Sequence, residues 1–376
     1  MSKRIVSVLH SDYVNDNRVF KMSTSLAESG LNVTIVAMKS DRTALVEQEG
    51  KVRVRRIRVM GQNLKGVFGH LLRTADFMRK VAWRYHRADV WHCNDFRPFL
   101  FGLWARMFNR ELVLVYDCHE LESERNGLPG IEKKIVKWVE KRFIHKHWII
   151  HVAEGIQEYY EQAYPKLKRD QSTIIYNAPH LSPPVKREDL FRKQFGIAAD
   201  ASIFIYQGGF IAGRGVEMLI EAFSGLPEAH LVFMGYGKLQ PLVEEAAKAS
   251  NIHFQPAVPY HEVVRYTSSA DFGLISVENI CLSYYHCMPN KLFEYIQSEI
   301  PILANDLLDC RNFLEKHGIG KAVENESAEA WRTAIKALAA GGKDSYAEAL
   351  QATKQRFHWE QEEAKLLAFY QRVIAE

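Results

Sequence analysis

The sequence predicts an α/β protein with two doubly wound domains, each a parallel sheet covered by helices on both faces. Three observations support this prediction. Short apolar runs alternate with stretches of helical spacing through the first half, a proline-rich segment interrupts the alternation, and the alternation then resumes. A chain of 376 residues is also long enough to form two cores.

In the first half, short β-branched and apolar runs indicate strands, and apolar residues three and four apart indicate helices. Because strand and helix alternate, we expect neighbouring strands to be parallel. The expected strands are 4–9, 33–37, 52–59, 89–93, 112–116, 148–152 and 172–176. The expected helices are 18–29, 67–85, 98–108, 131–145 and 154–164.

A stiff connector is predicted at 179–184, where Pro179, Pro183 and Pro184 fall within six residues. We therefore expect a first domain over 1–178 and a second over 185–358. The expected strands of the second domain are 203–206, 230–234, 252–254, 272–275 and 302–304. Its expected helices are 216–223, 239–249, 261–268 and 291–298, and the chain is helical again from about residue 328.

Composition favours a reduced cytoplasmic protein. Apolar residues make up 47% and charged residues 25%, as in a soluble globular protein. The five cysteines form no Cys-x-x-Cys pair. The chain has no apolar run of about 18 residues that would predict a membrane-spanning helix.

The net charge of +4 conceals an asymmetry between the two halves of the chain. Residues 1–178 hold 30 Lys and Arg against 20 Asp and Glu, and the remainder holds 19 against 25. The basic half is expected to face an anionic surface or ligand.

The segment Met288-Pro-Asn-Lys-Leu-Phe-Glu-Tyr295 carries the clearest functional signal. Proline is favoured in the first turn of a helix, and Lys291 and Glu294, three residues apart, share one helix face. A helix N-terminus attracts anions, so an added lysine suits a phosphate. A carboxylate one turn later suits the diol of a ribose. The segment predicts a nucleoside diphosphate ligand.

A glycine-rich turn, Gly208-Gly-Phe-Ile-Ala-Gly-Arg-Gly215, follows the first strand of the second domain and opens a helix. Glycines allow the backbone to approach an anion, and the Arg214 guanidinium can hold a phosphate through two hydrogen bonds. The alternative is an ordinary strand–helix turn with an exposed arginine. Its place in the same domain as Lys291 favours a phosphate site.

Several segments together resemble the family-4 glycosyltransferases. The block 208–223, Gly235-Tyr-Gly237 and the block 289–304 resemble the donor-binding domain of that family. Further resemblances lie at Asp16-Asn-Arg-Val19, Tyr116-Asp-Cys-His-Glu120, Tyr176-Asn-Ala-Pro179 and Phe357-His-Trp-Glu360. The resemblance implies the GT-B fold, in which two Rossmann-like domains face a central cleft and a C-terminal helix, here 359–376, crosses back to the first domain.

The resemblance also implies roles for single residues. Arg214 and Lys291 would hold the donor diphosphate, Glu294 would bind the ribose, and His119 would contact the donor sugar or stabilise charge near its anomeric carbon. The residues assigned to donor binding are Glu294, Asn290, Gly209, Gly235, Gly237, Val258 and His286. The donor would be a UDP- or GDP-sugar. Its sugar would be transferred, with retention of the anomeric configuration, to a glycan or polyprenyl-linked glycan in bacterial surface polysaccharide synthesis.

Two positions depart from the family pattern. The first Glu of the Glu-x7-Glu motif falls at position 286, where this chain has His286, and Gly209 stands where many relatives carry a second phosphate-binding arginine. The branch with a PNKLFEY-type motif has this character. No Asp-x-Asp occurs in the chain, and the site supplies its own cations, so we expect no metal and no cofactor.

Three features of the sequence each allow two interpretations. Asp16 and Arg18 form either a helix cap or part of a substrate site, and Tyr284 and Tyr285 either pack in the core or stack on a sugar. The basic amphipathic segment 131–148 is either a solvated helix face or a surface for an anionic membrane, which would place the protein peripherally on the inner face of the cell membrane.

Other functions remain as alternatives to glycosyl transfer. A GT-B-fold nucleotide-sugar epimerase needs no acceptor, and a phosphorylase needs inorganic phosphate. A dinucleotide-dependent oxidoreductase is disfavoured because the turn His10-Ser-Asp-Tyr-Val-Asn15 contains no glycine. A carbohydrate-binding scaffold is disfavoured by the presence of Arg214, Lys291 and Glu294. No nucleic-acid-binding module is recognised.

Overall fold

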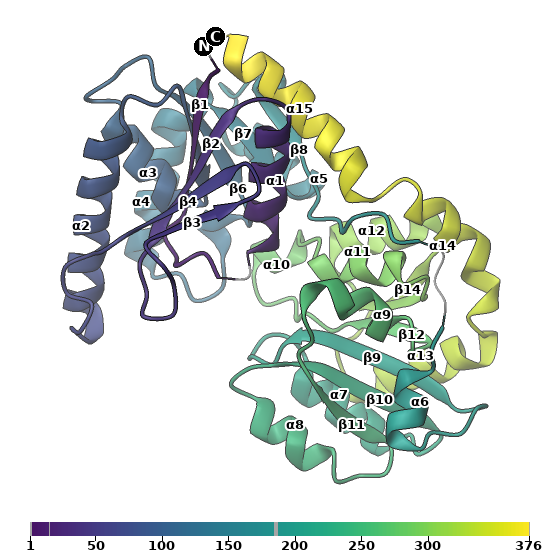
Figure 1. Ribbon diagram of the computed structural model, residues 1–376. Helices are drawn as coiled ribbons and strands as arrows, with labels where there is room; N and C mark the ends of the chain where they lie inside the picture. The colour runs from purple at the N-terminus through teal and green to yellow at the C-terminus, as the bar shows by residue number, and fades with distance from the viewer. Residues whose placement is uncertain (1, 15, 184–186, 376) are drawn as a thin grey trace. The chain divides into compact units, whose positions relative to one another are not determined.

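A computed structural model describes residues 2–14, 16–183 and 187–375 (Figure 1). The chain divides into two compact units. The first unit comprises Met1–Tyr176 together with Glu363–Glu376, and the second comprises Asn177–Glu362. Pro184, the last residue of the predicted linker, and residue 185, the predicted start of the second domain, lie outside the described residues.

The first unit contains an eight-stranded sheet in the order β3-β4-β2-β1-β5-β6-β7-β8 among the described residues. Neighbouring strands are parallel except for β3, which pairs antiparallel with β4 at the edge. The strands are β1 (Arg4–Val8), β2 (Asn32–Met38), β3 (Val46–Glu49), β4 (Val52–Ile57), β5 (Val90–Asn94), β6 (Val113–Cys118), β7 (Trp148–His151) and β8 (Ser172–Ile174).

Helices cover both faces of this sheet. The α-helices are α1 (Asn17–Glu28), α2 (Gly66–Tyr85), α3 (Phe96–Ala105), α4 (Gly130–Phe143), α5 (Glu154–Ala163) and the later part of α15 (Trp359–Ala375). The crossover from β1 to β2 runs in one direction along the sheet, and the crossovers from β4 to β5 and on to β8 run in the other. Right-handed connections therefore place α1 on one face and α2 to α5 on the other. Tyr370 of α15 contacts His92 of β5, whereas the next residue, Cys93, faces Gly102 of α3. The α15 helix therefore covers the same face as α1.

The second unit contains a six-stranded sheet in the order β11-β10-β9-β12-β13-β14, and its described strand pairs are parallel. The strands are β9 (Ser202–Gly209), β10 (Ala229–Tyr236), β11 (Ile252–Pro256), β12 (Phe272–Ile275), β13 (Ile302–Asn305) and β14 (Gly320–Val323). The helices are α6 (Leu190–Phe195), α7 (Val216–Ser224), α8 (Gln240–Ala246), α9 (Val263–Thr267), α10 (Leu282–Tyr285), α11 (Asn290–Gln297), α12 (Leu308–His317), α13 (Ala328–Gly341) and α14 (Ala347–Lys354).

Helix α11 is fixed against the sheet by Tyr295. Its hydroxyl lies 3.1 Å from the carbonyl oxygen of Ile205 in β9 and 3.0 Å from that of Leu274 in β12. A Cβ at Gly273 of β12 would lie 2.5 Å from the Tyr295 ring, so only glycine leaves room for the ring there. The start of α11, with Lys291 and Glu294, is thereby held beside the carboxyl ends of β9 and β12.

The predicted α/β class and the parallel sheets are confirmed, with a few local differences. Strand β3 was not predicted because its sequence, Val-Glu-Gln-Glu, shows no apolar pattern and its side chains lie at an exposed edge. Strand β14 and helices α6, α10 and α12 were also not predicted. None of the helices within the described ranges is long and apolar enough to cross a bilayer.

Candidate active site

The second unit brings several predicted donor-site residues to the carboxyl ends of β9 and β10. Gly235 of β10 pairs with Gly208 of β9, and a Cβ at Gly235 would lie 1.9 Å from the carbonyl oxygen of Gly208. The two strand ends can therefore approach this closely only because residue 235 is glycine. Gly209 is exposed at the end of β9, where its carbonyl oxygen accepts a 2.9 Å hydrogen bond from the Tyr206 hydroxyl.

Arg214 lies in the turn between β9 and α7. The following residue, Gly215, has φ +69°, and a Cβ there would lie 2.3 Å from the carbonyl oxygen of Ser276. The Arg214 guanidinium is half-buried and stands over the ring of Tyr284 in α10, with Cζ 4.7 Å from the ring centroid. A cation–π contact of this kind orients the guanidinium. Tyr284 therefore acts here as a support for a cation.

Lys291 lies in the first turn of α11 and its ammonium group contacts the ring of Tyr206, with Nζ 3.7 Å from the centroid. Burial is the main cause that lowers the pKa of Lys291 to about 7, and the positive charge of Arg214 lowers it further, while Glu294 opposes the shift. Two cations held near each other in a partly desolvated site repel one another, so a bound anion is favoured there.

Glu294 is positioned by a chain of side-chain hydrogen bonds. The Thr267 hydroxyl of α9 donates to the amide oxygen of Gln207, and the amide nitrogen of Gln207 donates to Oε2 of Glu294. Gln207 is buried at the end of β9. The carboxylate is thus held one turn into α11, on the same face as Lys291.

His286, at the position of the expected first motif Glu, lies within hydrogen-bond distance of Asp309 at the start of α12. Its Nδ1 lies 3.0 Å from Oδ2 of Asp309, and both side chains are largely buried. The adjacent Tyr285 ring meets the imidazole edge-on, with centroids 5.2 Å apart. A carboxylate is therefore present beside position 286, although it comes from a different helix.

The remaining predicted donor residues lie in loops and turns of the same unit. Asn290 is exposed at the start of α11, and its Oδ1 accepts a 3.0 Å hydrogen bond from Asn177. A Cβ at Gly237 would lie 2.3 Å from the carbonyl oxygen of Phe210. Val258 is half-buried in the loop after β11.

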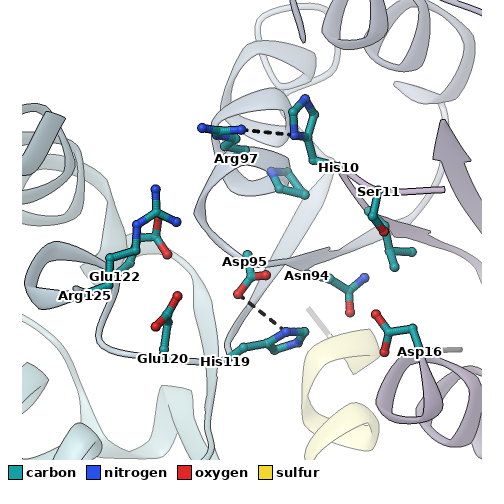
Figure 2. A pocket seen from close by; sticks show the side chains of 12 residues that line it. His10, Ser11, Asp16, Asn94, Asp95, Arg97, His119, Glu120, Glu122 and Arg125 are labelled. Atoms are coloured by element: carbon teal, nitrogen blue, oxygen red, sulfur yellow. Dashed lines mark hydrogen bonds and ion pairs between the residues drawn. The ribbon is translucent and has the colours of Figure 1, made fainter. Parts of the chain in front are cut away.

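A polar pocket of about 230 Å³ lies at the carboxyl ends of β1, β5 and β6 in the first unit (Figure 2). His119, which follows β6, lines it, as does Asn94 at the end of β5. The amide nitrogen of Asn94 donates to Ser7 and to the carbonyl oxygen of Val8, each at 3.0 Å. Its buried Oδ1 has no hydrogen-bond partner within the described part of the chain, so it can accept one from a ligand.

Asp117, fully buried at the end of β6, contacts His119, which lines this pocket. It receives two hydrogen bonds from Arg18 of α1, from Nε at 2.9 Å and from Nη2 at 2.6 Å, and it lies 3.0 Å from Nε2 of His119. Its Oδ2 also lies 3.4 Å from His92, whose other ring nitrogen contacts the Tyr370 hydroxyl of α15 at 2.7 Å. Although burial alone would raise it, Arg18 and His119 hold the pKa of Asp117 well below its usual range.

Asp95 faces His119 from the other side, with Oδ1 3.5 Å from Nδ1 (Figure 2). Its backbone has φ +73° and ψ 177°, a region that residues other than glycine rarely occupy. Burial lowers the pKa of His119, but the Asp95 and Asp117 carboxylates together raise it to about 9. The imidazole is therefore held as a cation at neutral pH.

The comparisons with known proteins cover both units of the chain. Residues 16–182 match Glycosyltransferase Family 4, and residues 201–340 match the glycosyl transferases group 1. The chain is a glycosyltransferase. No curated protein matches its sequence.

Solved structures show the fold of this glycosyltransferase. Sucrose-phosphate synthase from Thermosynechococcus elongatus matches with a TM-score of 0.78 at 18% identity, over 99% of both chains. HepE from Anabaena in complex with UDP-glucose matches with a TM-score of 0.77 at 14% identity, over 98% of this chain and 99% of that one. The catalytic domain of starch synthase IV from Arabidopsis thaliana, bound to ADP and acarbose, matches with a TM-score of 0.69 at 12% identity over both whole chains. The predicted GT-B fold with two Rossmann-like domains is confirmed.

Sequence reasoning missed several residues that shape the site of the glycosyltransferase. Asp95 and Asp309 gave no signal beyond their residue type, because their positions beside His119 and His286 depend on the fold. Asp16 and Arg18, left with two interpretations, prove to differ. Asp16 caps α1 by accepting a 3.2 Å hydrogen bond from the backbone N–H of Val19 and also lines the polar pocket, while Arg18 is buried against Asp117.

We predict that Asp95→Asn lowers the pKa of His119 from about 9 toward its ordinary value of 6.5, because one of two flanking negative charges is removed. In the unchanged protein, this pairing stabilises the fold fully below about pH 6.5 and its contribution is lost as the pH rises through about 9. The measurement is an NMR titration of the histidines, with His119 assigned by its absence in His119→Gln.

Asp89→Asn is the control, because Asp89 precedes β5, the strand that Asp95 follows, and pairs with Arg4. It should leave the titration of His119 unchanged. The same pKa of His119 in Asp95→Asn and in the unchanged protein would show that Asp95 does not act on the imidazole.

Proposed function

We propose that this glycosyltransferase moves a sugar from a nucleotide diphosphate sugar to a hydroxyl group of a glycan or lipid-linked glycan. The observation that carries the proposal is the convergence of Arg214, Lys291 and Glu294 at the carboxyl ends of β9 and β12, where doubly wound sheets bind ligands. The HepE structures that match this chain contain UDP, UDP-glucose, or UDP and glucose. These neighbours support a UDP-linked donor, and a GDP-linked donor is the alternative.

The diphosphate binds to Lys291, Arg214 and the N-terminus of α11. Its negative charge offsets the repulsion between the two cations and the desolvation of Lys291, both of which lower the pKa of that residue in the free protein. The same groups stabilise the charge that builds up on the leaving diphosphate. Preorganised electrostatic stabilisation of this kind usually makes the largest contribution to catalysis.

The nucleoside binds beside the diphosphate. Glu294 accepts hydrogen bonds from the ribose hydroxyls while Gln207 fixes its orientation. Asn290 and Gly209 adjoin the diphosphate, and the main chain near Gly235, Gly237 and Val258 contacts the base. His286, supported by Asp309, adjoins the sugar ring.

The first unit supplies the acceptor side of the reaction. The role given to His119, contact with the donor sugar, comes from the family resemblance, and the positive charge of the imidazole suits stabilisation of the leaving group or of a sugar hydroxyl. The unpartnered Asn94 oxygen suits an acceptor hydroxyl as a hydrogen-bond donor. The transfer retains the anomeric configuration, and the leaving phosphate takes the proton of the acceptor hydroxyl.

The acceptor belongs to bacterial surface polysaccharide or another glycan, carried on a polyprenyl lipid. The basic first half of the chain supports this assignment, because it holds ten more cationic than anionic side chains. The protein then works at the inner face of the cell membrane without spanning it. Attraction to anionic lipids contributes about 1 kcal/mol for each cation near the surface.

We predict that Lys291→Ala and Glu294→Ala each lower turnover by about 10²-fold or more, because each removes a group that holds the donor or its leaving charge. The measurement is release of nucleoside diphosphate from a donor sugar in the presence of acceptor. Lys248→Ala and Glu245→Ala are matched controls, since these residues form an exposed pair at the end of α8. Near-normal turnover in both site variants would exclude this donor site.

We further predict that transfer does not depend on a divalent metal, because two protein cations and a helix N-terminus already neutralise the diphosphate. The rate should be unchanged in excess EDTA. Activity that EDTA abolishes and Mg²⁺ or Mn²⁺ restores would contradict this prediction.

A further inference from the structure

Two helices of the first unit expose large apolar side chains to solvent. At the start of α2, Val67, Phe68 and Leu71 are 77%, 73% and 60% exposed. On α4, Ile131, Ile135 and Trp138 are 77%, 50% and 64% exposed. We refer to these six side chains as the apolar rim. Large apolar side chains that gather on the exposed surface of a protein mark an interaction site.

The α4 part of the rim is a continuous stripe. Ile131, Ile135 and Trp138 follow the spacing of one helix face, whereas Val136, Val139 and Glu140 are buried on the opposite side. The outward face of α4 is therefore apolar and exposed from Ile131 to Trp138.

The two parts of the rim lie on either side of Arg97. Its Nη1 lies 3.0 Å from Nε2 of His70 on α2, and its Nη2 lies 3.8 Å from Glu132 on α4. Arg97 also lines the polar pocket that contains His119. Whatever covers the rim is thus brought next to that pocket.

Cations adjoin the apolar side chains of the rim. Lys134, Lys141 and Arg142 are exposed on α4, and Lys65 is exposed immediately before α2. Lysines are depleted in the cores of protein–protein interfaces. Lysine and arginine beside tryptophan and aliphatic side chains are instead typical of helices that lie in the interface of an anionic membrane.

We propose that the apolar rim inserts into the headgroup region of an anionic bilayer and holds the mouth of the pocket at the membrane surface. This inference deepens the proposed function and rests on it, because a lipid-linked acceptor would present its sugar at that surface. Apolar insertion and attraction to lipid headgroups act together, so binding survives salt that screens the cations.

The test is binding of the full chain to vesicles of phosphatidylcholine with and without phosphatidylglycerol. The double variant Phe68→Ser, Ile131→Ser should bind vesicles with phosphatidylglycerol about tenfold more weakly than the unchanged protein, because both side chains leave the bilayer. The matched control is Trp83→Ser, Met107→Ser, which removes two side chains of the same unit that are 70% and 75% exposed but lie outside the rim. The control should bind as the unchanged protein does.

A second readout reports insertion directly. Lipids brominated on the acyl chains should quench the tryptophan fluorescence of the unchanged protein more than that of Trp138→Phe. Equal quenching of the two, equal loss of binding in rim and control variants, or no vesicle binding by the unchanged protein would overturn the inference. A dimer that the rim variant alone dissociates would assign the rim to a second copy of the chain and would also overturn it.

Calorimetry with UDP and GDP separates this inference from the proposed function. The rim variant should bind the nucleotide as the unchanged protein does, since the rim lies outside the donor-site residues. If neither nucleotide binds to the unchanged protein, the proposed nucleotide-sugar donor is contradicted, regardless of the result of the vesicle-binding experiment. If a nucleotide binds but the rim variant retains full vesicle binding, only the inference fails.

Discussion

The proposed reaction depends on the repulsion between the ammonium group of the half-buried Lys291 and the guanidinium of Arg214. In the free protein, burial and the Arg214 guanidinium both oppose the charge of Lys291, so its pKa falls to about 7. The fold maintains this unfavourable arrangement through rigid neighbours. Tyr295 fixes α11 against β9 and β12, Tyr206 packs under the ammonium group, and Tyr284 packs under Arg214. A diphosphate would relieve the repulsion, and that relief would favour its binding.

The first unit shows the opposite arrangement of charge. Its buried centre is the Asp117 carboxylate, which Arg18 and His119 compensate through short hydrogen bonds. Removing one partner of such a buried ion pair is strongly destabilising because the remaining charge stays buried away from water. The network extends through His92 to Tyr370, so the C-terminal helix contributes to the position of a pocket residue distant in the sequence. The strained backbone of Asp95 adds the second carboxylate beside His119.

Much of the fold follows from local patterns, because buried parallel strands are continuous apolar runs. Strand β12 was predicted with the bounds observed, 272–275, whereas β3 was missed because a polar edge strand has no such run. A shared role of Arg214 and Lys291 was predicted because both lie in the second domain and because the family resemblance assigns both to the donor diphosphate. The pairing of Arg18 with Asp117, 99 residues apart, was not, and neither was the positive φ of Asp95. Both depend on tertiary packing, which one sequence without its structure does not display.

The most direct test of this account is the exchange of protons when UDP or GDP binds. At about pH 8 most Lys291 side chains in the free protein should be neutral, and a bound diphosphate should raise their pKa and draw a proton from the solvent. Calorimetry in buffers with different ionisation enthalpies measures this uptake. We predict proton uptake by the unchanged protein and none by Lys291→Met. Binding without proton uptake, or the same uptake in Lys291→Met, would contradict the assignment of Lys291 to the diphosphate.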